Sequence, residues 1–123
     1  MELKQEELFN RWLSPPVEFA SEEAKSAYKA RVTRIKDAIQ LRKTPDRVPV
    51  FPLIGFFPAY YVGLTPYDMM YDYGKLKMAF KKYVLDFEPD AHAGAIGPGP
   101  GRFFEIMDYK LYAWPGHGVA KEH

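Results

Sequence analysis

Hydrophobic positions recur at helical spacing in the first third of the chain. Residues 2–13 place apolar side chains on one side of a short helix, which Ser14-Pro15-Pro16 ends because the residue before a proline disfavours the helical region. Ser21 is a suitable N-cap for a second helix, over residues 22–43, in which apolar residues return every three or four positions. Pro45 closes it. The pattern predicts two amphipathic helices.

A third long helix is predicted further along the chain, at residues 73–87. Its apolar stripe follows Asp72, which can cap the first turn, while lysines occupy the other side. Thr65 followed by Pro66 marks another helix start, since proline fits the first helical position. Shorter helical turns are expected at residues 59–62, 67–71 and 102–107.

Every residue from Val48 to Ile54 is apolar, so both faces of an extended segment would be apolar. This pattern predicts one strand buried on both faces. Pro52 is unusual inside a strand because it cannot donate to a ladder, but near the strand's end it would remove only one bond. Gly55 ends the strand. Residues 91–96 and 109–114 are weaker candidates for a second and a third strand.

Strands that alternate with helices indicate parallel pairing through right-handed crossovers. Two or three parallel strands cannot cover their own faces and edges, so their neighbours must come from further sequence or from another copy of the chain. The predicted fold class is therefore α/β: an incomplete (β/α)8 TIM barrel, made of N-terminal helices and the first two or three parallel strands.

Composition narrows the function. Aromatic residues form 16% of the chain, a load that needs deep cover or else forms a contact surface. The net charge of +1 does not favour nucleic acid or an anionic membrane. The absence of cysteine excludes thiolate chemistry and cysteine-ligated metals from this segment. No signal peptide is recognisable and no run reaches the roughly 18 apolar residues of a membrane span, so we expect a cytoplasmic protein.

The chain from Thr44 to Glu122 resembles the N-terminal part of the uroporphyrinogen decarboxylase family. Four features carry the resemblance, in this order: Pro45-Asp46-Arg47-Val48-Pro49-Val50, the aromatic stretch through Gly63-Leu64-Thr65, Phe87-Glu88-Pro89-Asp90, and the turn Trp114-Pro115-Gly116. The resemblance implies a (β/α)8 barrel, with residues 1–43 as capping helices and residues 44–123 as its first βα units, truncated. It also implies decarboxylation of a porphyrinogen-like substrate, or methyl transfer to a corrinoid carrier, in the full-length protein.

Active sites of such barrels lie at the carboxyl ends of the strands. The porphyrinogen decarboxylases carry arginines after the first strand for their carboxylate-rich substrate, but this chain has no arginine between Arg47 and Arg102. A polyanionic tetrapyrrole would meet an apolar rim here. The sequence therefore favours the methyltransferase branch, or a branch that acts on a less charged small molecule. A corrinoid protein is the corresponding partner.

The candidate substrate-binding residues are Phe56, Phe57, Tyr60, His92 and Arg102. The three aromatic residues, Phe56, Phe57 and Tyr60, can line a pocket for a flat or apolar substrate. They can also form a packed plug or a subunit contact. His92 can serve as acid, base or metal ligand, or as a hydrogen-bonded structural residue. The stiff loop at residues 97–101 positions Arg102, which can bind a carboxylate or form a surface ion pair.

Other polar residues have a structural interpretation. Asp46 and Arg47 fix the turn into the first strand, and His117, between two glycines, is exposed. The catalytic residues are not identifiable from the sequence, and no metal or cofactor is expected in this segment. The alternative function is a non-catalytic binding protein that forms homodimers or larger oligomers through exposed aromatic side chains.

Overall fold

The computed structural model describes residues 2–94 and 98–122, and side-chain positions from Lys4 onward within them. The described residues form six helices and two very short strands. The chain divides into two compact units, Met1–Phe51 and Pro52–His123, which we call the N-terminal and the C-terminal unit. Each is described by itself.

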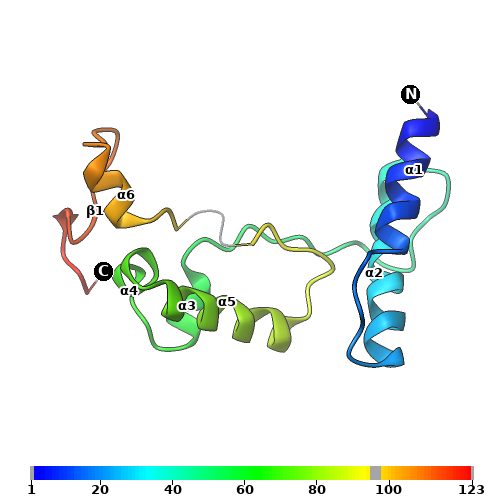
Figure 1. Ribbon diagram of the computed structural model, residues 1–123, viewed down its shortest axis with the longest axis horizontal. Coiled ribbons are helices and arrows are strands. Elements are labelled where there is room, and N and C mark those ends of the chain that lie inside the picture. The colour runs from blue at the N-terminus through cyan, green and yellow to red at the C-terminus, as the bar shows by residue number, and fades with distance from the viewer. Residues whose placement is uncertain (1, 95–97, 123) are drawn as a thin grey trace. The chain divides into compact units, whose positions relative to one another are not determined.

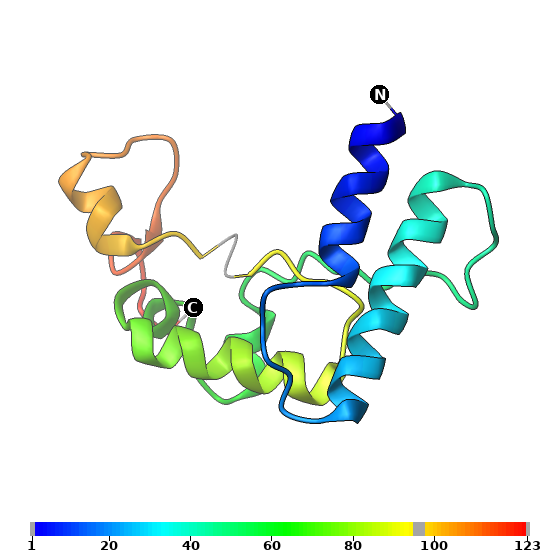
Figure 2. The ribbon, with the colours of Figure 1, turned by 45° about the vertical axis from the view of Figure 1, so that its right-hand side comes forward.

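The N-terminal unit is a helical hairpin. Helices α1 (Glu2–Leu13) and α2 (Glu22–Gln40) lie side by side (Figures 1 and 2). Phe9 of α1 and Val32 of α2 are buried in this unit, and the Tyr28 hydroxyl donates a 2.7 Å hydrogen bond to the Trp12 carbonyl. Because two helices offer few layers of side chains, little of this unit's apolar surface is buried.

Helix α2 begins where the sequence predicts and ends slightly earlier. The Ser21 hydroxyl accepts a 3.1 Å hydrogen bond from the Ala24 backbone N–H, so the predicted N-cap is confirmed. The helix ends at Gln40 instead of residue 43. Leu41 adopts a left-handed conformation (φ 54°), and its N–H donates to the Asp37 carbonyl, which closes the last turn before Pro45 is reached.

The C-terminal unit holds the hydrophobic core. Its helices are α3 (Phe57–Tyr61), α4 (Pro66–Tyr71), α5 (Tyr73–Phe87) and α6 (Gly101–Ile106). Figure 1 shows α3 and α4 gathered along α5, and contacts join all three pairs. The buried cluster consists of Ala59, Met69, Ala79 and Phe80, with partly buried neighbours Ile54, Phe56, Val62, Leu64 and Leu76.

Two predicted helix starts in this unit are confirmed. Thr65 and Asp68 form a reciprocal capping box on α4, in which each side chain accepts a hydrogen bond from the other residue's backbone N–H. The Asp72 carboxylate caps α5 by accepting from the Lys75 N–H at 3.0 Å. These local hydrogen bonds satisfy N–H groups that no helical carbonyl can reach.

The strands β1 (Trp114–Pro115) and β2 (Gly118–Val119) have two residues each. They pair in parallel register, with Trp114 opposite Gly118 and Pro115 opposite Val119. Gly116 and Gly118, both at φ 86°, allow the backbone to coil this tightly. The result is a small closed loop.

The prediction of a strand at Val48–Ile54 was wrong. These residues belong to no strand, because the described part of the chain offers no neighbouring strand, and Pro49 and Pro52 each lack a donor. Residues 91–94 of the second expected strand are likewise irregular, and residues 95–96 lie outside the described part. Of the third, 109–114, only Trp114 is in a strand.

The fold is thus mostly helical with one small parallel pair of strands, and a TIM barrel is not shown. The expected domain boundary between residues 43 and 44 stays a prediction. The division of the chain into two compact units falls later in the sequence, after Phe51. None of the described helices is long and apolar enough to cross a membrane.

Candidate functional site

Three of the expected site residues lie on or next to α3. Phe56 precedes the helix and packs, partly buried, against the hydrophobic cluster. Phe57 and Tyr60 belong to α3 and are exposed to solvent. The short helix begins here because Gly55 (φ 49°) turns the chain and Pro58 fits its first turn.

Phe57 is part of an aromatic cluster that joins α3 to the end of α5. Its ring centroid lies 6.0 Å from those of Tyr61 and Tyr83 and 5.7 Å from that of Phe87. Tyr61 and Phe87 are 5.0 Å apart in an edge-to-face arrangement. Such pairs contribute to packing beyond the area they bury. The packed-plug interpretation fits Phe57 better than a free pocket wall.

The polar edge of this aromatic cluster is electrically balanced. The Tyr61 hydroxyl donates a 2.8 Å hydrogen bond to the Asp86 carboxylate, which raises the pKa of Tyr61. Lys82 donates to the same carboxylate at 2.5 Å and, with Tyr61, lowers the pKa of Asp86. The ammonium and the carboxylate neutralise each other, so this edge offers no net charge to a substrate.

His92 lies in the irregular segment after α5. Its side chain is exposed, and its Nδ1 accepts a 3.0 Å hydrogen bond from the backbone N–H of Gly94. This bond requires an unprotonated Nδ1, so the proton of the neutral ring is on Nε2. The hydrogen-bonded structural role is the one that this geometry supports.

Arg102 forms an ion pair within α6. Its Nη1 donates to Glu105 Oε2 at 3.0 Å. Glu105 Oε1 accepts a 2.7 Å hydrogen bond from the Tyr71 hydroxyl. The Tyr71 hydroxyl oxygen in turn accepts a 3.0 Å hydrogen bond from Trp114 Nε1. The hydrogen bond from Tyr71 lowers the pKa of Glu105, and the hydrogen bond and the positive charge of Arg102 lower it further. Burial and the Glu105 carboxylate raise the pKa of Tyr71.

His117 stacks on this network. Its imidazole lies 4.3 Å from the Trp114 ring with an interplanar angle of 16°. Trp114 is buried against Phe104, at 5.6 Å between ring centroids. The sequence showed that His117 is flanked by glycines, but the indole beneath it is supplied by the folded loop. The only sequence signal for this stacked pair is the run Trp-Pro-Gly-His-Gly at residues 114–118.

The sequence also missed a buried arginine in the N-terminal unit. The Arg34 guanidinium binds the Asp46 carboxylate through two 2.6 Å hydrogen bonds, from Nε and from Nη2. Asp46 also accepts from the Arg47 N–H at 3.1 Å. Asp46 was predicted to fix this turn, and its partner in doing so is Arg34, 12 residues earlier in the chain.

This pair makes the stability of the N-terminal unit sensitive to acid. Hydrogen bonds from Arg34 lower the pKa of Asp46 to about 2, below its ordinary value of 3.8. The unfolded chain takes up this proton first as the pH falls, so the pair's stabilisation is complete above about pH 4 and is lost towards pH 2. We expect Asp46→Asn to weaken the dependence of the free energy of unfolding on pH, when denaturant unfolding is measured between pH 2 and 5. A variant slope equal to that of the unmodified chain would contradict the expectation.

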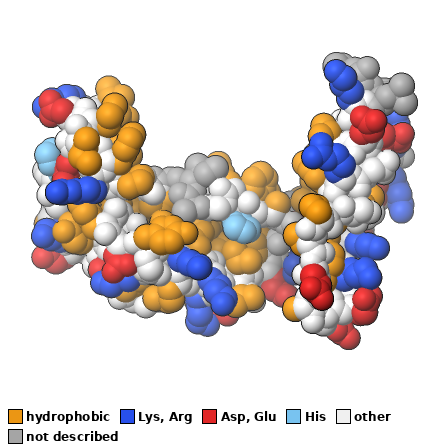
Figure 3. Space-filling view, viewed as in Figure 1, with side chains coloured by type: hydrophobic (Ala, Val, Ile, Leu, Met, Phe, Trp, Pro, Cys, Tyr) orange, Lys and Arg blue, Asp and Glu red, His pale blue; other side chains and the backbone are white. Residues whose placement is uncertain are grey.

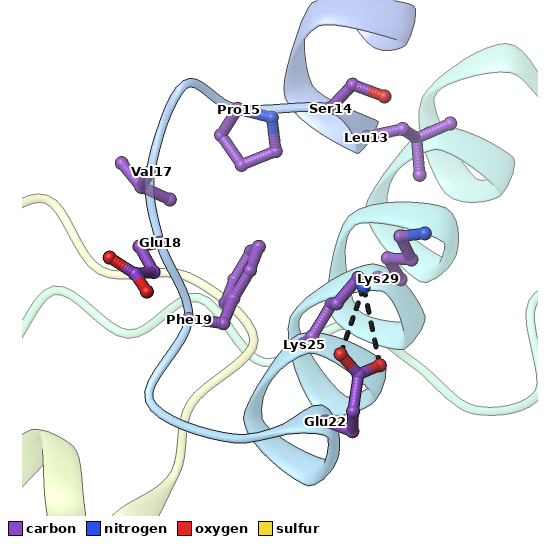
Figure 4. Close-up of a pocket in the computed structure, with 9 residues that line it drawn as sticks. All are labelled: Leu13, Ser14, Pro15, Val17, Glu18, Phe19, Glu22, Lys25 and Lys29. Atoms are coloured by element: carbon purple, nitrogen blue, oxygen red, sulfur yellow. Dashed lines mark hydrogen bonds and ion pairs between the residues drawn. The ribbon is translucent and has the colours of Figure 1, made fainter.

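A cavity of about 500 Å³ opens in the N-terminal unit where the loop after α1 passes the start of α2 (Figure 4). Leu13, Pro15 and Phe19 provide apolar walls. Glu22 and Lys25 form an ion pair of 3.1 Å at its rim, so the charges there are matched. None of the expected site residues lines it.

The structure groups the expected residues only in part. Phe56, Phe57 and Tyr60 lie together, but no described hydrogen bond, ion pair or ring contact joins them to His92 or Arg102. Within residues 2–94 and 98–122, no three His, Asp or Glu side chains are grouped so that they could hold a metal ion. A separate polar network, made of Arg102, Glu105, Tyr71 and Trp114, is joined by hydrogen bonds.

Comparison with known proteins found no matching family model, no matching curated protein and no matching solved structure.

Proposed function

We propose that this chain is the N-terminal part of an enzyme of the uroporphyrinogen decarboxylase type. In the proposal, residues 1–43 are the helices that precede a (β/α)8 barrel, and residues 44–123 supply its first βα units. The full-length enzyme would decarboxylate a porphyrinogen-like substrate or transfer a methyl group to a corrinoid carrier. The resemblance of the sequence motifs is the basis for this choice of family, and one structural observation supports the proposal that further strands complete the fold.

That observation is the exposed apolar segment 48–54. In extended backbone, side chains alternate between two faces. Here one face would carry Val48, Val50, Pro52 and Ile54, and the other Pro49, Phe51 and Leu53. Val48 is 81% and Leu53 is 85% exposed, although a segment apolar on both faces is typical of a parallel strand covered by helices. Burial of such side chains contributes roughly 25 cal/mol per Å².

The elements that follow this segment support the same arrangement. Gly55 turns the chain, and α5 then presents Phe80 and Tyr83 as a buried face. Ile54 already packs, partly buried, on the cluster that contains Phe80. A strand followed by a helix that covers it is the repeating unit of a (β/α)8 barrel, with its rim residues at the strand's carboxyl end. Phe56, Phe57 and Tyr60 would lie on that rim.

The charge distribution bears on the substrate. No lysine or arginine occurs between Arg47 and Lys75, so the stretch from 48 to 74 offers no cation to a carboxylate-rich tetrapyrrole. This favours methyl transfer, or decarboxylation of a less charged molecule. His92 and Arg102 would contribute from the second βα unit, and no cofactor-binding residue is assigned to this segment.

The proposal is tested by comparing the 123-residue chain with a longer product of the same reading frame. We expect no decarboxylation or methyl transfer from the short chain, and activity only from the long one. Amide hydrogen exchange should be fast at Phe51 and Leu53 in the short chain, and slowed in the long one because a neighbouring strand accepts their hydrogen bonds. Helix α5 serves as the internal reference.

Turnover by the 123-residue chain would refute the proposal. So would exchange at Phe51 and Leu53 that is already as slow as in α5, because the segment would then need no further strand. A reading frame that encodes no further βα units after His123 would have the same meaning.

A binding protein without catalysis is the second candidate, and the exposed aromatic cluster favours it. Phe57, Tyr61 and Phe87 pack against one another but remain about half exposed. Exposed apolar patches mark interaction sites. A stable homodimer in sedimentation equilibrium that dissociates in Tyr61→Lys would favour this candidate over the enzyme fragment.

A further inference from the structure

Helix α5 carries a second stripe of side chains, on the side opposite the one that it buries. Phe80 and Tyr83 face the core of the C-terminal unit. The members of the second stripe follow at intervals of four, three and four positions: Gly74, Met78, Lys81 and Leu85. Residues at this spacing share one face of a helix. Met78 is 46% and Leu85 is 64% exposed, so two apolar side chains of this face meet solvent.

This face forms a groove along the helix, with a volume of about 420 Å³. The residues that line it, which define the α5 groove, are Gly74, Lys77, Met78, Lys81, Lys82 and Leu85. At about 3.6 residues per turn, Lys77 and Lys82 fall on opposite sides of the stripe. Lysine stems add apolar surface while their ammonium groups stay in water. Figure 3 shows basic and hydrophobic side chains next to one another over α5. The α5 groove is therefore an apolar surface bordered by positive charge.

The chain itself neutralises only part of this charge. Lys82 Nζ donates a 2.5 Å hydrogen bond to the Asp86 carboxylate and is thereby paired. Lys77 and Lys81 have no ion-pair or side-chain hydrogen-bond partner among the residues that the structure describes. None of the described acidic side chains lines the groove. Because like charges four positions apart repel each other on a helix, a partner that supplies carboxylates would relieve this repulsion.

We propose that the α5 groove binds an amphipathic helix of a partner protein that places apolar side chains in the groove and carboxylates along its edges. Recognition of a helix in a groove uses apolar anchors at intervals of three and four residues. Met78 and Leu85 lie about two turns apart and match such anchors, and methionine adapts to the shape of its partner. Carboxylates of the partner pair with Lys77 and Lys81, in the way that charges beside the seam select partners in coiled coils.

A partner helix fits this groove better than an anionic membrane does. A helix that lies on a membrane inserts a broad apolar face into the lipid. Here the apolar face is a narrow stripe between lysines, and Lys81 interrupts it. A carboxylate opposite Lys81 compensates for the interruption, which lipid chains cannot do. The net charge of the whole chain, +1, also gives little attraction to an anionic surface.

The inference goes beyond the proposed function and does not depend on it. In a (β/α)8 barrel the helices form an outer ring around the strands. Helix α5 would bury Phe80 and Tyr83 against the strands and leave the α5 groove on the outside. The groove is therefore open to a partner in the 123-residue chain and in a longer product alike. Peptide binding and enzymatic activity are separate measurements, and either can fail without the other.

The test titrates the 123-residue chain with a synthetic helical peptide of about four turns, which carries leucines on one face and glutamates beside them. The control peptide has glutamine in place of every glutamate. Calorimetry measures affinity, and NMR follows the methyl group of Met78. We expect the acidic peptide to bind, to shift the Met78 signal, and to bind more weakly when the ionic strength is raised to about 1 M. The glutamine peptide should bind roughly tenfold more weakly because it loses several ion pairs. Equal binding of the two peptides, or an unshifted Met78 signal, would overturn the proposal.

Matched variants locate the binding. Lys77→Gln and Lys81→Gln should each weaken it roughly two- to fivefold, the range of an exposed ion pair. Leu85→Ala should weaken it about tenfold because an apolar anchor is lost. Lys110→Gln and Leu111→Ala make the same changes at exposed positions of the same unit and should leave the affinity unchanged. Circular dichroism verifies that each variant is folded. If the groove variants and the two controls bind alike, the α5 groove is not the binding site.

Two other occupants are outcomes of the same design. Phosphatidylserine vesicles may be added in place of the peptide. If they bind the chain but not its Lys77→Gln variant, and the acidic peptide does not bind, the groove is a lipid site and the proposal is wrong. If the chain alone forms a dimer in sedimentation equilibrium that dissociates in Leu85→Ala, a second copy occupies the groove and the proposal is equally wrong.

Discussion

Replacing Trp114 with alanine is expected to lower the free energy of unfolding of the C-terminal unit by about 3–5 kcal/mol. The Trp114 side chain is 2% exposed and contacts the rings of Phe104, Tyr112 and His117. Its Nε1 also donates to the Tyr71 hydroxyl, which would lose a partner. The variant therefore loses apolar burial, several ring contacts and one partly buried hydrogen bond together.

Guanidinium unfolding followed by circular dichroism measures this loss. The matched control is Trp12→Ala in the N-terminal unit, because the Trp12 side chain is 46% exposed and its ring contacts Phe9 at 5.4 Å. We expect that change to cost about 1 kcal/mol. Equal losses in the two tryptophan variants would mean that the loop around Trp114 is not folded as described.

Replacing Phe80 with alanine is expected to have a similarly large effect, about 3–5 kcal/mol. Phe80 is 7% exposed and belongs to the buried cluster with Ala59, Met69 and Ala79, which come from α3, α4 and α5. Three helices meet at this ring. The cavity left by its removal cannot be filled by a single local movement, so most of the lost contacts stay lost.

The same unfolding measurement applies, with Phe103→Ala as the control within the same unit. Phe103 is 54% exposed on α6, and we expect its replacement to cost about 1 kcal/mol or less. A Phe80→Ala variant no less stable than Phe103→Ala would show that the core of the C-terminal unit lies elsewhere.

Local signals were sufficient for the helices. Ser21, Thr65 and Asp72 each accept a hydrogen bond from a backbone N–H three residues later, so their effect is contained in a few neighbouring positions. The apolar stripe of α5 was legible for the same reason, since it follows the helical period. Helix α2 ended early because a left-handed residue closed it, which its sequence pattern did not mark.

The candidate site was predictable only residue by residue. Phe57 and Arg102 were recognised as chemically suitable, but the sequence did not reveal that Phe57 packs on α5 or that Arg102 is bound to Glu105. The hydrogen bonds from Tyr71 to Glu105 and from Trp114 to Tyr71 span 34 and 43 positions. No periodicity or short motif encodes contacts of that range.

The sequence by itself determined where helices begin, because a cap needs only its own next three residues. It also determined that residues 48–54 are apolar on both faces, but not that they form a strand, since a strand's hydrogen bonds must come from another strand. Only the tertiary structure decided that this segment stays exposed and that His117 rests on a buried indole. The exposure of this segment and the stacking of His117 both depend on distant parts of the chain. No local sequence pattern fixes the positions of those parts.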